Sequence, residues 1–181
     1  PKYKLDVKDP HTFGSLTTPD WYYELRYKIQ KAQENSIDVI REAQAEFKEM
    51  FGREYGLVEE YKCEDADTIL VAVSTAASTA KETVDELRSK GVKAGLLRLR
   101  FVRPFPYEDV RKALSSAKKI LVLDRNLSPG SGGIIFQEIK SAMYNEKSRP
   151  PIYGFIAGLG GRDITVQSIA ALFEHAEKND P

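Results

Sequence analysis

The segment KKILVLDRNLSPGSGGIIFQEIKSAMYNE, residues 118–146, contains a complete strand–loop–helix unit. Its first part, KKILVLD (118–124), is an apolar run of the kind found in strands that are buried on both faces of a sheet. Residues 133–146 carry apolar side chains at helical spacing. The loop between the two parts contains an acid, a base and three glycines. Open α/β sheets bind ligands at strand ends of this kind, so the segment is either a binding loop or a turn whose glycines only permit positive φ.

The same alternation extends over residues 57–178 of the chain. Apolar runs predict strands at LVEEYKC (57–63), TILVAVS (68–74), VKAGLLRLR (92–100), KKILVLD (118–124) and PIYGFIAGL (151–159). Amphipathic stretches between and after them predict helices at 79–91, 107–117, 133–146 and 165–178. This order predicts an α/β domain with a parallel or mostly parallel sheet and helices on both of its faces.

The first third of the chain follows a different pattern. Residues 1–20 contain three prolines and no sustained period, which predicts an irregular arm. From Trp21 to Phe51 apolar residues recur at steps of three and four, which predicts a long amphipathic helix with Asp20 as its N-cap. Such a helix is roughly 45 Å long, more than a compact domain needs, and is typical of a connector or a docking element. We therefore predict two parts: an arm with a connecting helix (1–56) and an α/β domain (57–181).

Charge and cysteine content narrow the classes of function. Lys plus Arg and Asp plus Glu each total 27, so no net field favours nucleic acid or an anionic membrane surface as a partner. The single cysteine, Cys63, cannot hold an iron–sulfur cluster alone, and it suits a reducing cytoplasm. His11 and His175 lack the spacing of metal ligands, and no apolar run of 18 residues predicts a membrane span. We expect no catalytic residue and no metal site in this chain.

Four loops that follow predicted strands could meet at one edge of a parallel sheet. STAAST (74–79) could bind an anion at a helix start, or Ser74 or Thr75 could simply cap that helix. RFVRPFP (100–106), with Arg98 before it, could bind an anion or another subunit, or be a solvated strand edge.

The other two of these loops are rich in glycine. DRNLSPGSGG (124–133) could form a backbone nest for an anion with Arg125 as a donor, or a turn or subunit contact. GLGGRDIT (158–165) lacks the third glycine of a dinucleotide fingerprint and is better interpreted as a tight turn that leads to Thr165 as an N-cap. The candidate residues for an anion or subunit contact are Arg103, Asp124, Arg125, Ser128, Gly130, Ser131, Gly132, Gly133, Gly160, Gly161 and Arg162.

Three blocks in order, GLLRLRFVRPFP (95–106), VLDRNLSPGSGG (122–133) and YGFIAGLGGRDIT (153–165), resemble the C-terminal half of the alpha subunit of 2-oxoacid:ferredoxin oxidoreductases of the pyruvate synthase type. Two upstream blocks, DPHTFGSLTTPDWYYE (9–24) and DTILVAVSTAASTAKETVDELRSKG (67–91), resemble the same family. The resemblance implies a three-layer α/β/α sandwich with a mostly parallel five-stranded sheet, similar to the transketolase C-terminal domain and preceded by a long helix.

The resemblance also implies a function for the complex to which the chain would belong. That complex oxidatively decarboxylates a 2-oxoacid, forms acyl-coenzyme A and reduces ferredoxin. Within the family the acid could be pyruvate, a branched-chain 2-oxoacid or 2-oxoglutarate, and overall similarity favours pyruvate. Thiamine diphosphate, Mg²⁺ and iron–sulfur clusters are expected in the complete complex, and none is expected in this chain. The expected partners are the other subunits, with ferredoxin and coenzyme A reached through the complex, in the cytoplasm. This part would serve assembly and be inactive alone; the alternative is a free-standing module that binds a nucleotide or coenzyme A.

Overall fold

The computed structural model describes residues 4–11, 14 and 16–181. The chain forms two compact units, of which the first ends at Ser36 and the second runs Ile37–Pro181. Helix α1 (Pro19–Phe51) begins in the first unit, and its last turns belong to the second. A domain boundary between residues 56 and 57 stays a prediction.

Helix α1 begins slightly earlier than its sequence pattern indicates. The amides of Trp21 and Tyr22 both donate to the carbonyl oxygen of Thr18, each at 3.1 Å, so the helix is already formed at Asp20. Asp20 therefore lies in the first turn, and the prediction that it is the N-cap is wrong. Pro19 opens the helix because its fixed φ suits the first helical position, where an N–H group would lack an intrahelical partner. No residue of α1 is buried.

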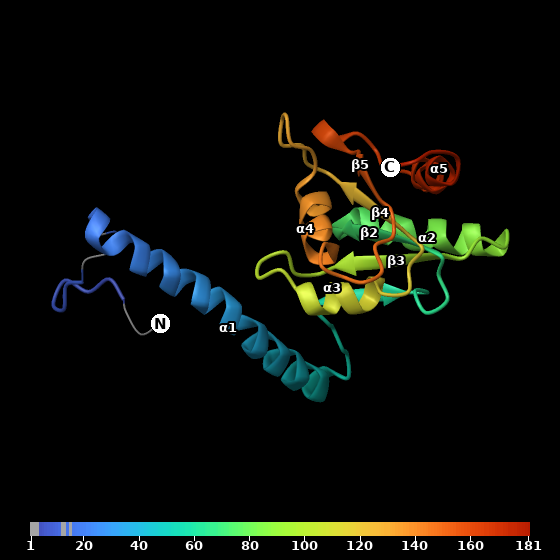
Figure 1. The fold of residues 1–181 in the computed structure, drawn as a ribbon. Coiled ribbons are helices and arrows are strands. Elements are labelled where there is room, and N and C mark those ends of the chain that lie inside the picture. Colours follow the sequence, from blue (N-terminus) through green and yellow to red (C-terminus); the bar gives the residue numbers. More distant parts are fainter. Residues whose placement is uncertain (1–3, 12–13, 15) are drawn as a thin grey trace. The chain divides into compact units, whose positions relative to one another are not determined.

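The second unit contains a five-stranded sheet in the order β1-β3-β2-β4-β5 (Figure 1). Its strands are β1 (Val58–Tyr61), β2 (Thr68–Val73), β3 (Ala94–Leu99), β4 (Lys119–Asp124) and β5 (Ile152–Ile156). Strands β3, β2, β4 and β5 run parallel, and only the short edge strand β1 pairs antiparallel, with β3. The prediction of a mostly parallel five-stranded sheet is confirmed.

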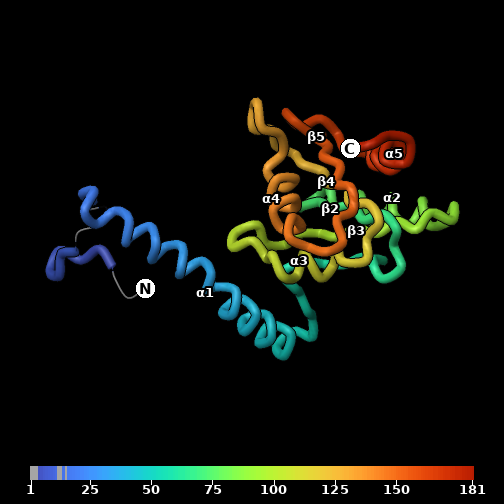
Figure 2. Tube along the Cα trace, viewed as in Figure 1, coloured from blue at the N-terminus to red at the C-terminus, as the bar shows by residue number. Residues whose placement is uncertain are grey.

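Helices cover both faces of this sheet, as Figures 1 and 2 show. Helices α2 (Ser74–Ser89) and α5 (Val166–Lys178) pack together on one face, and α3 (Tyr107–Leu114) and α4 (Ile134–Met143) pack together on the other. A short 3-10 helix, η1 (Leu159–Gly161), lies between β5 and α5. The three-layer α/β/α arrangement is therefore confirmed.

Helix α2 starts at Ser74, not at Thr79, so the predicted loop STAAST (74–79) is wrong: these residues are the first turns of the helix. Ser74 makes the turn from strand to helix with a positive φ of 53°. Ala76 and Ala77 are buried against the sheet, and their small side chains allow the helix to begin directly at the strand end. Because alanine also has the highest helix propensity, the segment is helical despite its polar composition.

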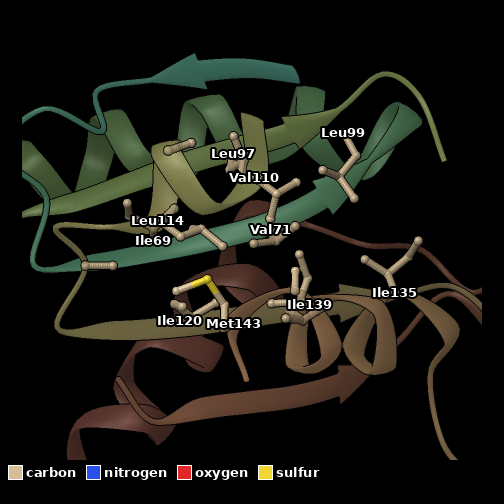
Figure 3. Packing of buried hydrophobic residues seen from close by; sticks show 14 of the residues in the cluster. Ile69, Val71, Leu97, Leu99, Val110, Leu114, Ile120, Ile135, Ile139 and Met143 are labelled. Carbon is tan, nitrogen blue, oxygen red and sulfur yellow. The ribbon is translucent and has the colours of Figure 1, made fainter. Parts of the chain in front are cut away.

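The buried side chains form two clusters, one on each face of the sheet. Along β2, Ile69 and Val71 belong to the cluster under α3 and α4, whereas Leu70 and Ala72 belong to the cluster under α2 and α5. All four are fully buried, since successive side chains of a strand point to opposite faces. Figure 3 shows the first cluster, in which Ile139 of α4 lies among strand residues. Because both faces of these strands are buried, successive residues are apolar and the strands appear in the sequence as unbroken apolar runs.

Two isoleucines of α4 give a matched test of this packing. Ile139 is fully buried, whereas Ile134 is 45% exposed at the start of the same helix. We expect Ile139→Ala to lower the free energy of unfolding by about 2–5 kcal/mol because it leaves a cavity, and Ile134→Ala to change it by less than about 1 kcal/mol. Urea unfolding followed by circular dichroism measures both. Equal effects of the two substitutions would contradict the burial of Ile139 between α4 and the sheet.

Candidate functional site

The carboxyl ends of β2, β4 and β5 meet at one edge of the sheet, because these strands are neighbours and run parallel. A hollow of about 200 Å³ lies there, which we call the strand-end pocket. Its lining comes from the start of α2, from the residue after β4 and from the segment between β5 and α5. The lining residues are Thr75, Ala76, Thr79, Arg125, Gly161, Arg162, Asp163 and Ile164.

Arg125 is held in this pocket by two features. Its Nη1 donates a hydrogen bond to Oγ1 of Thr75 at 3.1 Å, which links the end of β4 to the start of α2. Gly158 is buried with a φ of 74°, and a Cβ at this position would lie 3.0 Å from Nε of Arg125 and 2.8 Å from Cδ1 of Ile164. The glycine therefore provides both the left-handed turn and the space for the guanidinium group.

Arg162 and Asp163 carry the other charges of the pocket. Both are exposed, and within the part of the chain that the structure describes neither side chain has a hydrogen-bond or ion-pair partner. Gly160 and Gly161 precede them with φ values of 63° and 84°, so the turn places Arg162 beside the pocket.

The turn ends at helix α5 as its sequence predicts. Thr165 is the N-cap: its side chain accepts from the amide of Ser168, and the Ser168 side chain accepts from the amide of Thr165. This capping box confirms the interpretation of GLGGRDIT (158–165) as a tight turn before a capped helix. A role of Gly160, Gly161 and Arg162 in contacts with a ligand or subunit stays a prediction.

Asp124 is fully buried and points toward helix α4 rather than into the pocket. Its Oδ1 accepts from the amide of Ile135 and from the side-chain amide of Asn126, and its Oδ2 accepts from the amide of Phe136, all at 2.9 Å. Oδ1 of Asn126 accepts from the amide of Ile134 at 3.0 Å. The first three amides of α4 thus bind side chains of the same chain, and in this structure they are not free for an external anion.

Gly133 is needed for this arrangement, because a Cβ at this position would lie 2.1 Å from Oδ2 of Asp124. The rest of the loop closes on itself: Ser128 and Gly132 exchange two backbone hydrogen bonds of 2.9 Å. Ser131 donates its amide to the Ser128 carbonyl at 2.9 Å and accepts from the side chain of Gln137. Gly130 and Gly132 have positive φ values of 80° and 105° at this turn. Contact of this exposed loop with another subunit stays a prediction.

The arginines of the RFVRPFP region bind carboxylates of the same chain. Arg103 does not line the strand-end pocket; its Nη2 donates to Oε1 of Glu138 on α4 at 2.6 Å. The hydroxyl of Tyr107 donates to the other oxygen of Glu138 at 3.0 Å, and burial together with this hydrogen bond raises the pKa of Tyr107. Arg100 donates to Glu59 at 2.5 Å. Much of the positive charge of this region is therefore compensated within the chain.

Glu59 on β1 pairs with several cationic side chains, and the sequence pattern did not predict this cluster. Lys81 of α2 and Arg98 and Arg100 of the β3 region all pair with its carboxylate. Burial by itself would raise the pKa of Glu59, but the hydrogen bond from Lys81 and the nearby guanidinium groups outweigh it and lower the pKa. The pairing of Glu59 opposite Arg98 in the β1–β3 ladder brings these groups together, and this register cannot be read from composition.

Metal-ligating side chains do not gather in the part of the chain that the structure describes. No group of three or more His, Cys, Asp or Glu side chains in residues 4–11, 14 and 16–181 could hold a metal ion. Cys63 is buried, its thiol donates to the Leu96 carbonyl at 3.2 Å, and burial raises its pKa to about 11. A thiol with this pKa is a poor ligand and nucleophile at neutral pH. Among the same residues, no helix is long and apolar enough to cross a membrane.

Comparison with solved structures first shows which fold class this domain has. The fold is similar to that of a split-gene transketolase with a TM-score of 0.51 and 15% identity, over 65% of this chain and 40% of that one. It is equally similar, with a TM-score of 0.51 and 21% identity, to that of the 2-oxoglutarate:ferredoxin oxidoreductase of Magnetococcus marinus, over 66% of this chain and 19% of that one. The domain therefore has the transketolase C-terminal-like fold.

Sequence then defines the family. Residues 66–169 match the family described as pyruvate:ferredoxin oxidoreductase core domain II, and the chain belongs to this family. It is 49% identical over 177 residues to the pyruvate synthase subunit PorA of Methanothermobacter thermautotrophicus, covering 98% of this chain and 45% of that protein. It is 45% identical over 180 residues to the ketoisovalerate oxidoreductase subunit VorA of Pyrococcus horikoshii, covering 98% and 46%. The chain thus spans about half the length of these relatives, and the predicted family resemblance is confirmed.

Removal of the Asp124 carboxylate tests its role at the start of α4. In Asp124→Ala the amides of Ile135 and Phe136 lose their partner, so we expect the free energy of unfolding to fall by about 2–4 kcal/mol. Asp163→Ala is the control, because the Asp163 carboxylate is exposed and has no partner in the described part of the chain; we expect a change below about 0.5 kcal/mol. Urea unfolding measures both, and an Asp124→Ala value within error of the control would contradict this role.

The Glu59 cluster predicts a pH dependence of stability. A carboxyl group whose pKa is lowered in the folded state stabilises the fold above its unfolded pKa of about 4.3, and this contribution is lost as pH falls through the folded value. We expect Glu59→Gln to lower the free energy of unfolding by about 1–2 kcal/mol at pH 7, with a difference that shrinks below about pH 4. Urea unfolding between pH 3 and 7 measures this difference. Glu60→Gln, at the exposed neighbouring position, should show no comparable trend.

Proposed function

We propose that this chain is the second domain, with its leading helix, of the alpha subunit of a 2-oxoacid:ferredoxin oxidoreductase. The observation that carries the proposal is the family match over residues 66–169, supported by identities of 41–49% to curated subunits along nearly the whole chain. A free-standing nucleotide- or coenzyme A-binding module is not favoured, because these relatives are subunits of oxidoreductases.

In the proposed function, the complete complex decarboxylates a 2-oxoacid, transfers the acyl group to coenzyme A and passes electrons to ferredoxin. Thiamine diphosphate supplies the carbanion chemistry and iron–sulfur clusters carry the electrons. We propose that these groups and Mg²⁺ lie in other parts of the complex; in residues 4–11, 14 and 16–181 no group of three or more His, Cys, Asp or Glu side chains could hold a metal ion. Pyruvate is the proposed substrate because pyruvate synthase subunits are among the relatives; a branched-chain 2-oxoacid is the alternative, since ketoisovalerate oxidoreductase subunits are also among them.

The proposed role of this part is assembly with the other domains and subunits. Helix α1 supports this role, because Trp21, Tyr23 and Ile29 are 69%, 77% and 53% exposed and no residue of the helix is buried. Large aromatic side chains are enriched where protein interfaces gain most of their affinity. The loop 124–133 is the second proposed contact. The proposed partners are the other subunits, with ferredoxin and coenzyme A reached through the complex, in the cytoplasm.

The activity is tested on the complex that contains this chain, purified through an affinity tag on the chain. We expect ferredoxin reduction that depends on a 2-oxoacid and coenzyme A, with pyruvate used more efficiently than 2-oxoisovalerate or 2-oxoglutarate. The assay compares kcat/KM for the three acids under anaerobic conditions. A complex that reduces ferredoxin with none of them would overturn the proposed function, and a preference for 2-oxoisovalerate would replace pyruvate as the substrate.

The assembly role is tested on the same complex with Trp21→Ala combined with Tyr23→Ala. Loss of two exposed aromatic anchors should release the other subunits, which native mass spectrometry detects, while the unfolding of the α/β domain stays unchanged. Lys28→Ala, at an exposed position of the same helix, is the matched control. Intact assembly of the double variant would show that these side chains are not part of an interface.

A further inference from the structure

We propose that the strand-end pocket binds a small anion that carries a phosphoryl group. The first argument is charge. The pocket contains the guanidinium groups of Arg125 and Arg162 against the single carboxylate of Asp163. Five other arginines of the α/β domain pair with carboxylates of the chain, namely Arg88, Arg98, Arg100, Arg103 and Arg111, whereas Arg149 donates to the backbone carbonyl of Glu146. Among residues 4–11, 14 and 16–181, the side chain of Arg125 has only the neutral hydroxyl of Thr75 as its hydrogen-bond partner, and the side chain of Arg162 has none.

The second argument is that the side chain of Arg125 is already oriented by a hydrogen bond. Its hydrogen bond to Thr75 uses one of five N–H groups, so the remaining donors of the planar guanidinium are available for an anion. The space above Gly158 lets the side chain lie across the end of β5. A guanidinium that is already oriented loses little conformational entropy when it binds phosphate in the bidentate geometry that arginine favours.

The third argument comes from the helix side of the pocket. Thr75 and Thr79 provide hydroxyl groups, and no side chain caps the start of α2. The helix dipole adds partial positive charge at this end, next to the two arginines. These groups add to the charge of Arg125 and Arg162, which carry the proposal.

Size and the remaining carboxylate define the ligand. A hollow of about 200 Å³ is smaller than the roughly 300–1,000 Å³ of pockets that enclose drug-sized ligands, so it can hold one phosphoryl group but not a whole nucleotide. Asp163 opposes an anion, so we expect a dissociation constant on the order of 1 mM rather than tight binding. The ligand is therefore inorganic phosphate or the phosphoryl group of a phosphate monoester.

The test is a titration of the full chain at constant ionic strength, with sodium chloride balancing the added salt. Nuclear magnetic resonance follows the amides of Thr75–Ala77 and the Nε–Hε signals of Arg125 and Arg162, with inorganic phosphate and methyl phosphate as separate probes. We expect saturable shifts at these groups. Tighter binding of methyl phosphate identifies a monoester as the ligand, and tighter binding of inorganic phosphate identifies the free anion.

Variants distinguish binding of phosphate in the strand-end pocket from general attraction of the anion to a positively charged surface. Arg162 has no structural partner in the described part of the chain, so Arg162→Ala should fold normally and weaken binding about tenfold, whereas Asp163→Asn should tighten it several-fold. Arg149→Ala is the control: Arg149 precedes β5, at the opposite edge of the sheet, and should leave binding unchanged. Absence of saturable shifts, or equal affinity in Arg162→Ala, overturns the proposal. The proposal does not rest on the oxidoreductase function, and ferredoxin reduction by the complex is measured separately.

Discussion

Burial of the central strands on both faces is the constraint on which the rest of the domain depends. Every side chain of β2 from Ile69 to Ala72 is fully buried, and its neighbours β3 and β4 are nearly as well covered. Parallel neighbours of this kind need connections that cross from one edge of the sheet to the other, and helices provide them. As a result, the segments that follow β2, β4 and β5 all begin at the carboxyl edge. The strand-end pocket exists because the topology collects these segments there.

The fold was largely predictable because this constraint leaves a direct signature in the sequence. Unbroken apolar runs such as TILVAVS (68–74) and KKILVLD (118–124) are typical of strands that are covered on both faces, as these two strands are. The start of α2 was not predictable in the same way. The serines and threonines of STAAST favour caps and turns when read alone, and packing of Ala76 and Ala77 against the sheet, together with the helix propensity of alanine, makes the segment helical. Local composition therefore failed where a tertiary contact decides the conformation.

The candidate site was predictable in its location but not in the roles of its residues. Arg125, Gly161 and Arg162 do meet in one pocket, as their positions after parallel strands suggested. Arg103 binds Glu138, a partner 35 positions away in the chain, and Glu59 gathers cations from α2 and the β3 region. Such pairings depend on register and on helix docking, which single-sequence periodicity does not contain. Sequence reasoning thus found the edge of the sheet where polar residues gather and could not assign which of them already have partners.

Asp124 and Arg125 are neighbours at the end of β4, and their side chains contact helices on opposite faces of the sheet. Successive residues of a strand point to opposite sides, so Asp124 faces α4 and Arg125 reaches Thr75 of α2. The Asp124 carboxylate accepts hydrogen bonds from the first amides of α4 and so satisfies that end of the helix. This close approach requires a glycine at position 133. The guanidinium, one position later, meets no carboxylate in the described part of the chain and remains available on the other face. An acid followed by a base at this position is therefore a consequence of strand geometry: the first residue stabilises the loop that carries it, and the second leaves a positive charge at the pocket.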